Sequence, residues 1–168
     1  MLSESARMSS AVEARFRIAT PNSRPRAVRV IALDAPAERV VRTLSTGPWN
    51  HTTFLTASAL SGAPRDAGGV EGWLADLSGQ TRGLAGEVAG ADLVVMVATA
   101  GEDAHAAAWI GEACSRRRVS TTVLMLGGPA TPDAALSATL AQVRPWALML
   151  VLAASEDYIH DMLLALRA

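Results

Sequence analysis

The sequence predicts a single α/β domain, in which a mainly parallel sheet is covered by helices on both faces. Short apolar segments recur along the chain, and each is followed by a segment with the spacing of a helix. The apolar segments are hydrophobic throughout, which is typical of strands that are buried on both faces. About five such units follow one another, and this number indicates a three-layer Rossmann-like or flavodoxin-like sandwich.

The five units can be placed in order along the chain. The predicted strands cover residues 27–33, 52–58, 92–100, 119–126 and 146–154. The predicted helices cover residues 35–45, 70–90, 102–118, 132–143 and 156–168. Asp34, Thr131 and Ser155 are expected to cap or open three of these helices, because short oxygen-bearing side chains accept hydrogen bonds from the first backbone N–H groups.

The amino-terminal region is expected to stand apart from these units. Residues 1–10 have the composition of a flexible tail, and the domain is predicted to span residues 11–168. In VEARFRIA, residues 12–19, apolar and polar side chains alternate with period two, as they do in a half-buried strand. This segment is a candidate for an additional strand.

Composition argues against several classes of partner. Fifteen basic and sixteen acidic residues leave a formal net charge of −1, which gives no electrostatic footprint for nucleic acid or for an anionic membrane surface. The longest apolar runs are far shorter than the roughly 18 residues of a membrane-spanning helix. The amino terminus lacks the apolar core of a secretory signal, and there is one cysteine, so a cytoplasmic location is predicted.

All fifteen basic residues are arginine, so the chain is lysine-free. A GC-rich bacterial genome would explain this bias. The absence of lysine removes the phosphate-binding lysine of a P-loop and the lysine of a Schiff base. The first predicted strand is also followed by DAPAER, which has none of the glycines of a dinucleotide fingerprint. Standard NAD, FAD or P-loop nucleotide binding is therefore disfavoured, and the cofactor, if any, is unassigned.

A ligand of such a fold is expected beyond the carboxyl ends of the strands. The candidate ligand-binding residues at this edge are Asp34, Thr99, Gly101, Glu102, Asp103, His105, Gly127, Gly128, Asp157 and His160. Glu102 and Asp103 are predicted to lie in the first turn of a helix, where their charge complements the helix dipole and repels a phosphate. The alternative is that these carboxylates hold a divalent cation or a cationic ligand.

Two acid and histidine pairs stand at helical spacing, Glu102 with His105 and Asp157 with His160. They would form a shared metal site only if the two helix starts were neighbours. In the flavodoxin-like strand order the third and fifth helices cover opposite faces of the sheet, and a strand end separates them. No metal site is therefore predicted.

One cysteine and two tryptophans are further candidates for a function. Cys114 lies among apolar neighbours of a predicted helix and is expected to be buried and inert. Trp49 and Trp73 are candidates for contacts with a protein partner, because tryptophan often anchors interfaces. Trp49 precedes the second strand, so it is expected at the amino-terminal edge of the sheet, opposite the ligand edge.

Residues 86–126 resemble the central part of the nucleotide-binding half of the tubulin/FtsZ superfamily. In that family a helix ends near an alanine–aspartate pair, and a strand then leads into a glycine-rich phosphate loop. Here the loop positions run from Thr99 to His105 and hold one glycine and two acids, and the first loop reads ALDAPAER. The resemblance therefore implies a reduced, degenerate nucleotide-binding fold that does not hydrolyse GTP.

The function expected from these patterns is binding without catalysis. A small cytoplasmic module would act through a protein partner or through self-association as a homo-oligomer, and it could hold a modest ligand at the carboxyl edge. The alternative is a metal- or nucleotide-dependent enzyme or sensor that uses the acidic rim and its histidines. Neither nucleic acid nor membrane is expected as a partner.

Overall fold

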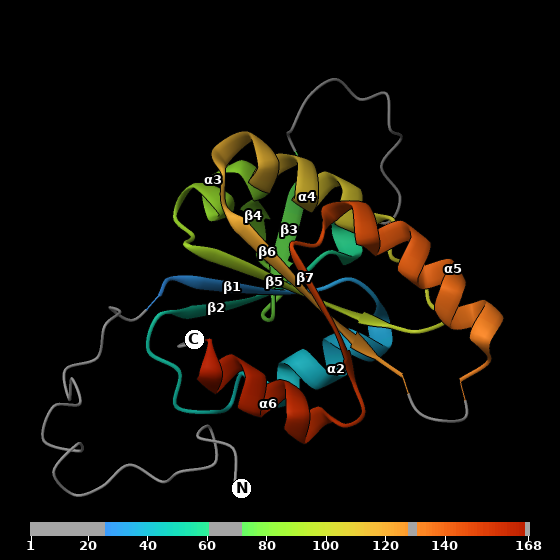
Figure 1. Ribbon diagram of the computed structural model, residues 1–168. Helices are drawn as coiled ribbons and strands as arrows, with labels where there is room; N and C mark the ends of the chain where they lie inside the picture. Colours follow the sequence, from blue (N-terminus) through green and yellow to red (C-terminus); the bar gives the residue numbers. More distant parts are fainter. Residues whose placement is uncertain (1–25, 61–71, 128–130, 167–168) are drawn as a thin grey trace, which may run out of the picture.

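A computed structural model describes residues 26–60, 72–127 and 131–166, which form an α/β sandwich on one seven-stranded sheet (Figure 1). The strands are β1 (Val28–Ala32), β2 (Thr52–Thr56), β3 (Trp73–Asp76), β4 (Thr81–Gly83), β5 (Leu93–Thr99), β6 (Ser120–Leu126) and β7 (Met149–Ala153). Their order in the sheet is β4-β3-β2-β1-β5-β6-β7. The strands β2, β1, β5, β6 and β7 pair in parallel, and this is the flavodoxin-like order. The predicted fold class is confirmed, with more strands than expected.

Helices cover both faces of this sheet. They are α2 (Ala35–Leu44), α3 (Leu84–Ala89), α4 (Ala106–Arg117), α5 (Asp133–Val143) and α6 (Glu156–Ala165), with short 3₁₀ turns η2 (Ser58–Leu60) and η3 (Arg144–Trp146). Buried side chains of α2 and α6 share one core, and those of α3, α4 and α5 share the other. Figure 1 shows α2 and α6 together on one side of the sheet and α4 on the opposite side.

The central strands are apolar throughout because each of their faces meets a different core. In β5, Val95 and Val97 pack toward α2 and α6, whereas Val94 and Met96 pack toward α4. All four side chains are fully buried. At about 25 cal/mol for each Å² of apolar surface removed from water, such strands contribute a large share of the folding free energy.

The prediction of one helix over residues 70–90 is wrong for residues 73–83, where β3 and β4 form an antiparallel hairpin on the edge of β2. The tight turn of this hairpin explains the difference. The Asp76 Oδ1 atom accepts hydrogen bonds from the Ser78 and Gln80 backbone N–H groups, both at 2.9 Å, and Gly79 adopts φ +87°. That turn chemistry favours a hairpin over a continuous helix.

Two helix starts also differ from expectation. Helix α4 begins at Ala106 rather than at residue 102, with His105 as its N-cap, so Glu102 and Asp103 precede the helix. Helix α5 is capped by Pro132 without a side-chain bond, so Thr131 is not its cap. The predicted caps Asp34 and Ser155 are confirmed, since their side chains accept hydrogen bonds from backbone N–H groups in the first turns of α2 and α6.

Some predictions concern residues outside the described ranges. The tail at 1–10, the strand proposed for 12–19 and Gly128 all belong to that group. Among the described residues, no helix has both the length and the apolar character that crossing a membrane requires.

Candidate functional site

Asp34 and Thr99 lie at the point where this fold normally binds its ligand, the crevice between the carboxyl ends of β1 and β5. The two residues bind each other there. The Asp34 carboxylate accepts hydrogen bonds from the Thr99 backbone N–H at 2.7 Å and from the Thr99 hydroxyl at 2.9 Å. It also accepts the Ala37 N–H at 2.7 Å as the cap of α2. An internal carboxylate thus occupies the donors that a ligand phosphate would use.

In the loop from Thr99 to His105, the other backbone N–H groups, except that of Asp103, are bound within the protein as well. The Gly101 N–H donates to the Thr139 Oγ1 atom at 3.0 Å, and the Ala104 N–H donates to the Gln142 Oε1 atom at 2.6 Å. The remaining acceptors are Leu126 O for Ala100, Thr99 O for Glu102 and Asp103 Oδ1 for His105. For Asp103 alone, no acceptor is found in the described part of the chain.

Two side chains of α5 therefore hold the loop closed. Thr139 is fully buried, and its hydroxyl also donates to the Glu102 carbonyl at 3.0 Å. A phosphate could reach these amides only by displacing bonds that the protein already makes, and a buried donor or acceptor left without a partner costs about 1–3 kcal/mol. The loop has the position of a phosphate loop without its free amides.

The acidic side chains of this loop point to solvent rather than to a common centre. Glu102, Asp103 and His105 are exposed, and the Asp103 carboxylate contacts the His105 ring. The prediction that Glu102 and Asp103 sit in the first helical turn is wrong, because Gly101 turns the chain at φ +93° before the helix begins. The Glu102 and His105 pair is therefore not set by helical spacing.

The two acid and histidine pairs are separated, as the flavodoxin-like order predicts. The strand β6 lies between β5 and β7, and α4 and α6 pack on opposite faces. His160 packs edge-on against the Trp49 ring, with 5.4 Å between centroids. Among residues 26–60, 72–127 and 131–166, no group of three or more His, Cys, Asp or Glu side chains could hold a metal ion.

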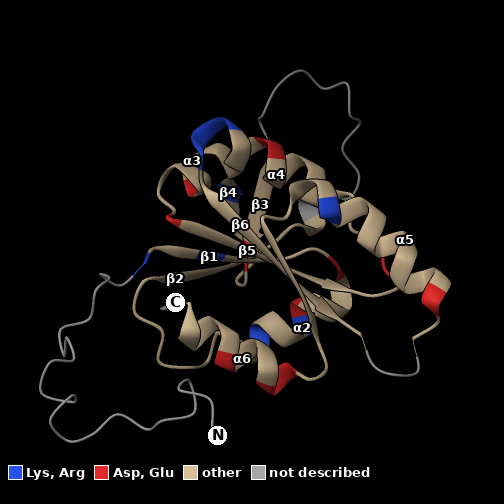
Figure 2. Ribbon diagram, in the orientation of Figure 1, with Lys and Arg blue, Asp and Glu red and all other residues tan. Residues whose placement is uncertain are grey.

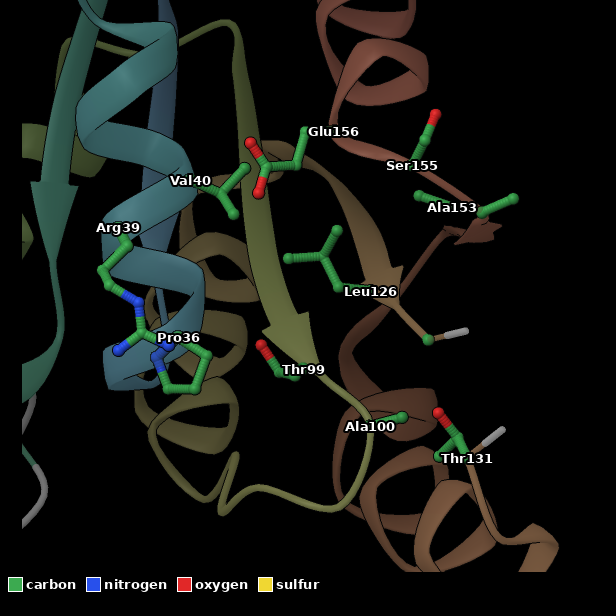
Figure 3. A pocket seen from close by; sticks show the side chains of 12 residues that line it. Pro36, Arg39, Val40, Thr99, Ala100, Leu126, Thr131, Ala153, Ser155 and Glu156 are labelled. Atoms are coloured by element: carbon green, nitrogen blue, oxygen red, sulfur yellow. The ribbon is translucent and has the colours of Figure 1, made fainter. Parts of the chain in front are cut away.

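A cavity of about 350 Å³ opens beside the blocked crevice, over the carboxyl ends of β5, β6 and β7 (Figure 3). Of the predicted site residues, Thr99 and Gly127 line it, whereas Asp157 and His160 do not. Arg39 of α2, which was not among the predicted positions, also lines it, as does Glu156 of α6, which lies within the stretch 155–160 expected at this edge. Position on the two helices that flank the carboxyl ends was the only signal for these residues.

The remaining single-residue predictions concern two tryptophans and the cysteine. Trp49 is half-buried: its indole N–H donates to the Leu44 carbonyl at 2.6 Å, and its ring packs against Phe54. Trp73 is 56% exposed on β3, so its ring remains accessible. Cys114 is buried, and burial raises the pKa of its thiol to about 11, so the thiol is protonated at neutral pH.

The two edges of the sheet differ in chemistry. The outer strand on one side, β4, has three residues and carries Arg82. The outer strand on the other side, β7, is apolar along its whole length, and Figure 1 shows it in front of the other strands. Beside and within it, Leu148 is 79% exposed and Leu152 is 54% exposed. An apolar edge of this kind is a template for pairing with another chain.

No family model matches this chain, and no curated protein matches it.

Proposed function

We propose that this protein is a non-catalytic cytoplasmic module of Rossmann-like fold that acts by binding a protein, another chain or its own copy, at the β7 edge of its sheet. The observation that supports this proposal most directly is the apolar character of the β7 edge. From Pro145 to Ala154 the sequence has no charged side chain, and Leu148, Met149 and Leu152 are exposed. Burying such side chains against a partner is favourable, at about 25 cal/mol for each Å² of apolar surface.

The closed state of the usual ligand edge supports binding without nucleotide chemistry. Asp34, Thr139 and Gln142 hold backbone N–H groups that a nucleotide phosphate would need. We also propose kinship with the tubulin/FtsZ superfamily, as a reduced member that does not hydrolyse GTP, because these backbone N–H groups are not free to bind a phosphate. The near-neutral net charge of −1 gives no reason to propose nucleic acid as a partner.

A small ligand in the 350 Å³ cavity is the second candidate function. The cavity lies where this fold holds its ligands, and its size is at the lower end of the range for small-molecule sites. The cation of Arg39 and the carboxylate of Glu156 both line it, around an apolar floor of Val40 and Leu126. A thermal-shift panel of small metabolites, divalent metals and nucleotides tests this. A shift in melting temperature that Arg39→Ala abolishes supports a ligand in this cavity. If no compound shifts the melting temperature, this candidate function is wrong.

The main proposal is tested by affinity purification of the full chain from its native host. Leu152→Lys places a charge on the proposed edge, and Leu164→Lys is the matched control, because Leu164 is equally exposed, at 54%, but lies on α6 outside the edge strand. We expect a protein at stoichiometric yield with the wild-type chain and the control, and its loss with Leu152→Lys. If nothing is recovered at stoichiometric yield and the chain alone is monomeric, the proposal is wrong.

A further inference from the structure

The geometry points to a second copy of this chain as the occupant of the β7 edge, paired antiparallel, β7 against β7. This inference rests on the proposed function and names its partner. Antiparallel pairing about a twofold axis would join the two sheets into one continuous sheet that runs from one β4 edge to the other. Each copy would contribute the same surface, as a closed twofold interface requires.

The charges at the two ends of β7 favour this orientation. Arg144 precedes the strand, and Glu156 and Asp157 follow it. Figure 2 shows basic colour where α5 ends and acidic colour where α6 begins. Antiparallel pairing sets the Arg144 end of each β7 beside the acidic end of the other copy, whereas parallel pairing sets like charges at the same end. All three side chains are exposed, and no ion pair of theirs is found among the described residues.

The stretch between these charges is neutral, which favours an identical partner over a charged one. Pro145 to Ala154 offers no side chain that could pair with a charge on a foreign chain. Against its own copy it meets only apolar side chains, and aliphatic cross-strand pairs stabilise sheets. The opposite edge strand β4 has Arg82, a charged residue of the kind that protects an edge from pairing, and β7 has none.

A pair of five-residue strands is a small interface, so the dimer should be in exchange with monomer at micromolar concentration. Light scattering coupled to size exclusion, across low to high micromolar concentrations of the full chain, measures this. We expect the mass to rise with concentration toward twice the 17.5 kDa of the chain. Leu152→Lys should hold the mass at that of the monomer with an unchanged circular dichroism spectrum, and Leu164→Lys should behave as wild type.

A charge exchange tests the antiparallel orientation. Arg144→Glu should weaken the dimer by on the order of ten-fold, because it sets acids against acids at both ends of the interface. Adding Glu156→Arg to that variant should recover most of the loss. If the double variant forms a dimer no more tightly than Arg144→Glu alone, the strands do not pair in this orientation.

Other occupants give different results. If the wild type is monomeric but another protein is captured in a Leu152-dependent manner, the second copy is wrong and the proposed function stands. If the wild type is monomeric and a chain lacking residues 1–25 dimerises, the protein's own amino-terminal region covers β7, and the inference is overturned. A dimer that persists in Leu152→Lys, or is lost in Leu164→Lys, also overturns it.

Discussion

Replacing Asp34 by alanine should destabilise the protein far more than the loss of an ordinary surface carboxylate. Loss of a helix N-cap costs about 0.5–2 kcal/mol. Loss of the two Asp34 bonds to Thr99, which are hydrogen bonds to a charged group, would add about 1.5–3 kcal/mol each if both donors stayed dry. Asp34 is only half-buried, so water can replace part of these bonds. We expect a net loss of about 2–4 kcal/mol in the free energy of unfolding.

Urea denaturation followed by circular dichroism measures this loss, with Asp133→Ala as the matched control. Asp133 is an exposed acid in the first turn of α5, so its removal should cost about 0.3–1 kcal/mol through the helix dipole. Asp34→Asn should fall between wild type and Asp34→Ala, because its amide nitrogen cannot accept the hydrogen bonds that one carboxylate oxygen accepts. An Asp34→Ala loss no greater than that of Asp133→Ala would refute the reasoning.

The same variant provides a second measurement. Asp34→Ala frees the Ala37 N–H in the first turn of α2, where an anion is favoured, and the Thr99 N–H at the end of β5. Inorganic phosphate should therefore raise the melting temperature of Asp34→Ala more than that of wild type or Asp133→Ala. An equal effect on all three chains would show that Asp34 does not stand in for a phosphate.

Three further outcomes follow from local geometry. Gly111→Ala should cost about 1–3 kcal/mol in chemical denaturation, because the new Cβ would lie 2.5 Å from the Trp146 Cβ, and an unchanged midpoint would contradict this contact. Arg118→Gly should be more stable than Arg118→Ala by roughly 1 kcal/mol, because residue 118 has φ 56° at the end of α4, a conformation that glycine adopts without strain. Both variants lack the charge, so equal stability would contradict the left-handed cap. Hydrogen bonds from Ser78 and then Gln80 lower the pKa of Asp76 to about 2 from 3.8, so the hairpin is stabilised above pH 4 and loses this contribution as the pH falls to 2. An NMR titration of the Asp76 carboxyl that gave a pKa near 3.8 would contradict the turn.

The strands β1, β5 and β6 could be predicted to within two residues, because apolar runs bounded by polar residues leave little choice. The hairpin of β3 and β4 could not be recognised from periodicity. The residues around Leu74 and Leu84 have a spacing that also suits a helix, and the turn at Asp76, Ser78 and Gly79 was the better signal. The hydrogen bonds of the turn therefore determine that this segment forms a hairpin and not a helix.

The candidate site was predicted in position but not in detail. Asp34 and Thr99 could be placed at one edge of the sheet, whereas their mutual hydrogen bonds join residues 65 apart and depend on β1 pairing with β5. Thr139 and Gln142 reach the loop from α5, and no local pattern shows that a helix side chain will bind a distant amide. The edge strand β7 could be identified only once the strand order was known.

The claim that the loop after β5 is closed by the protein's own side chains can be measured amide by amide. Hydrogen exchange followed by NMR on the ligand-free chain reports the Thr99, Gly101 and Ala104 amides directly. Slow exchange of all three is predicted, because Asp34, Thr139 and Gln142 bind them. Fast exchange of these amides that becomes slow only when a magnesium nucleotide is added would contradict the account.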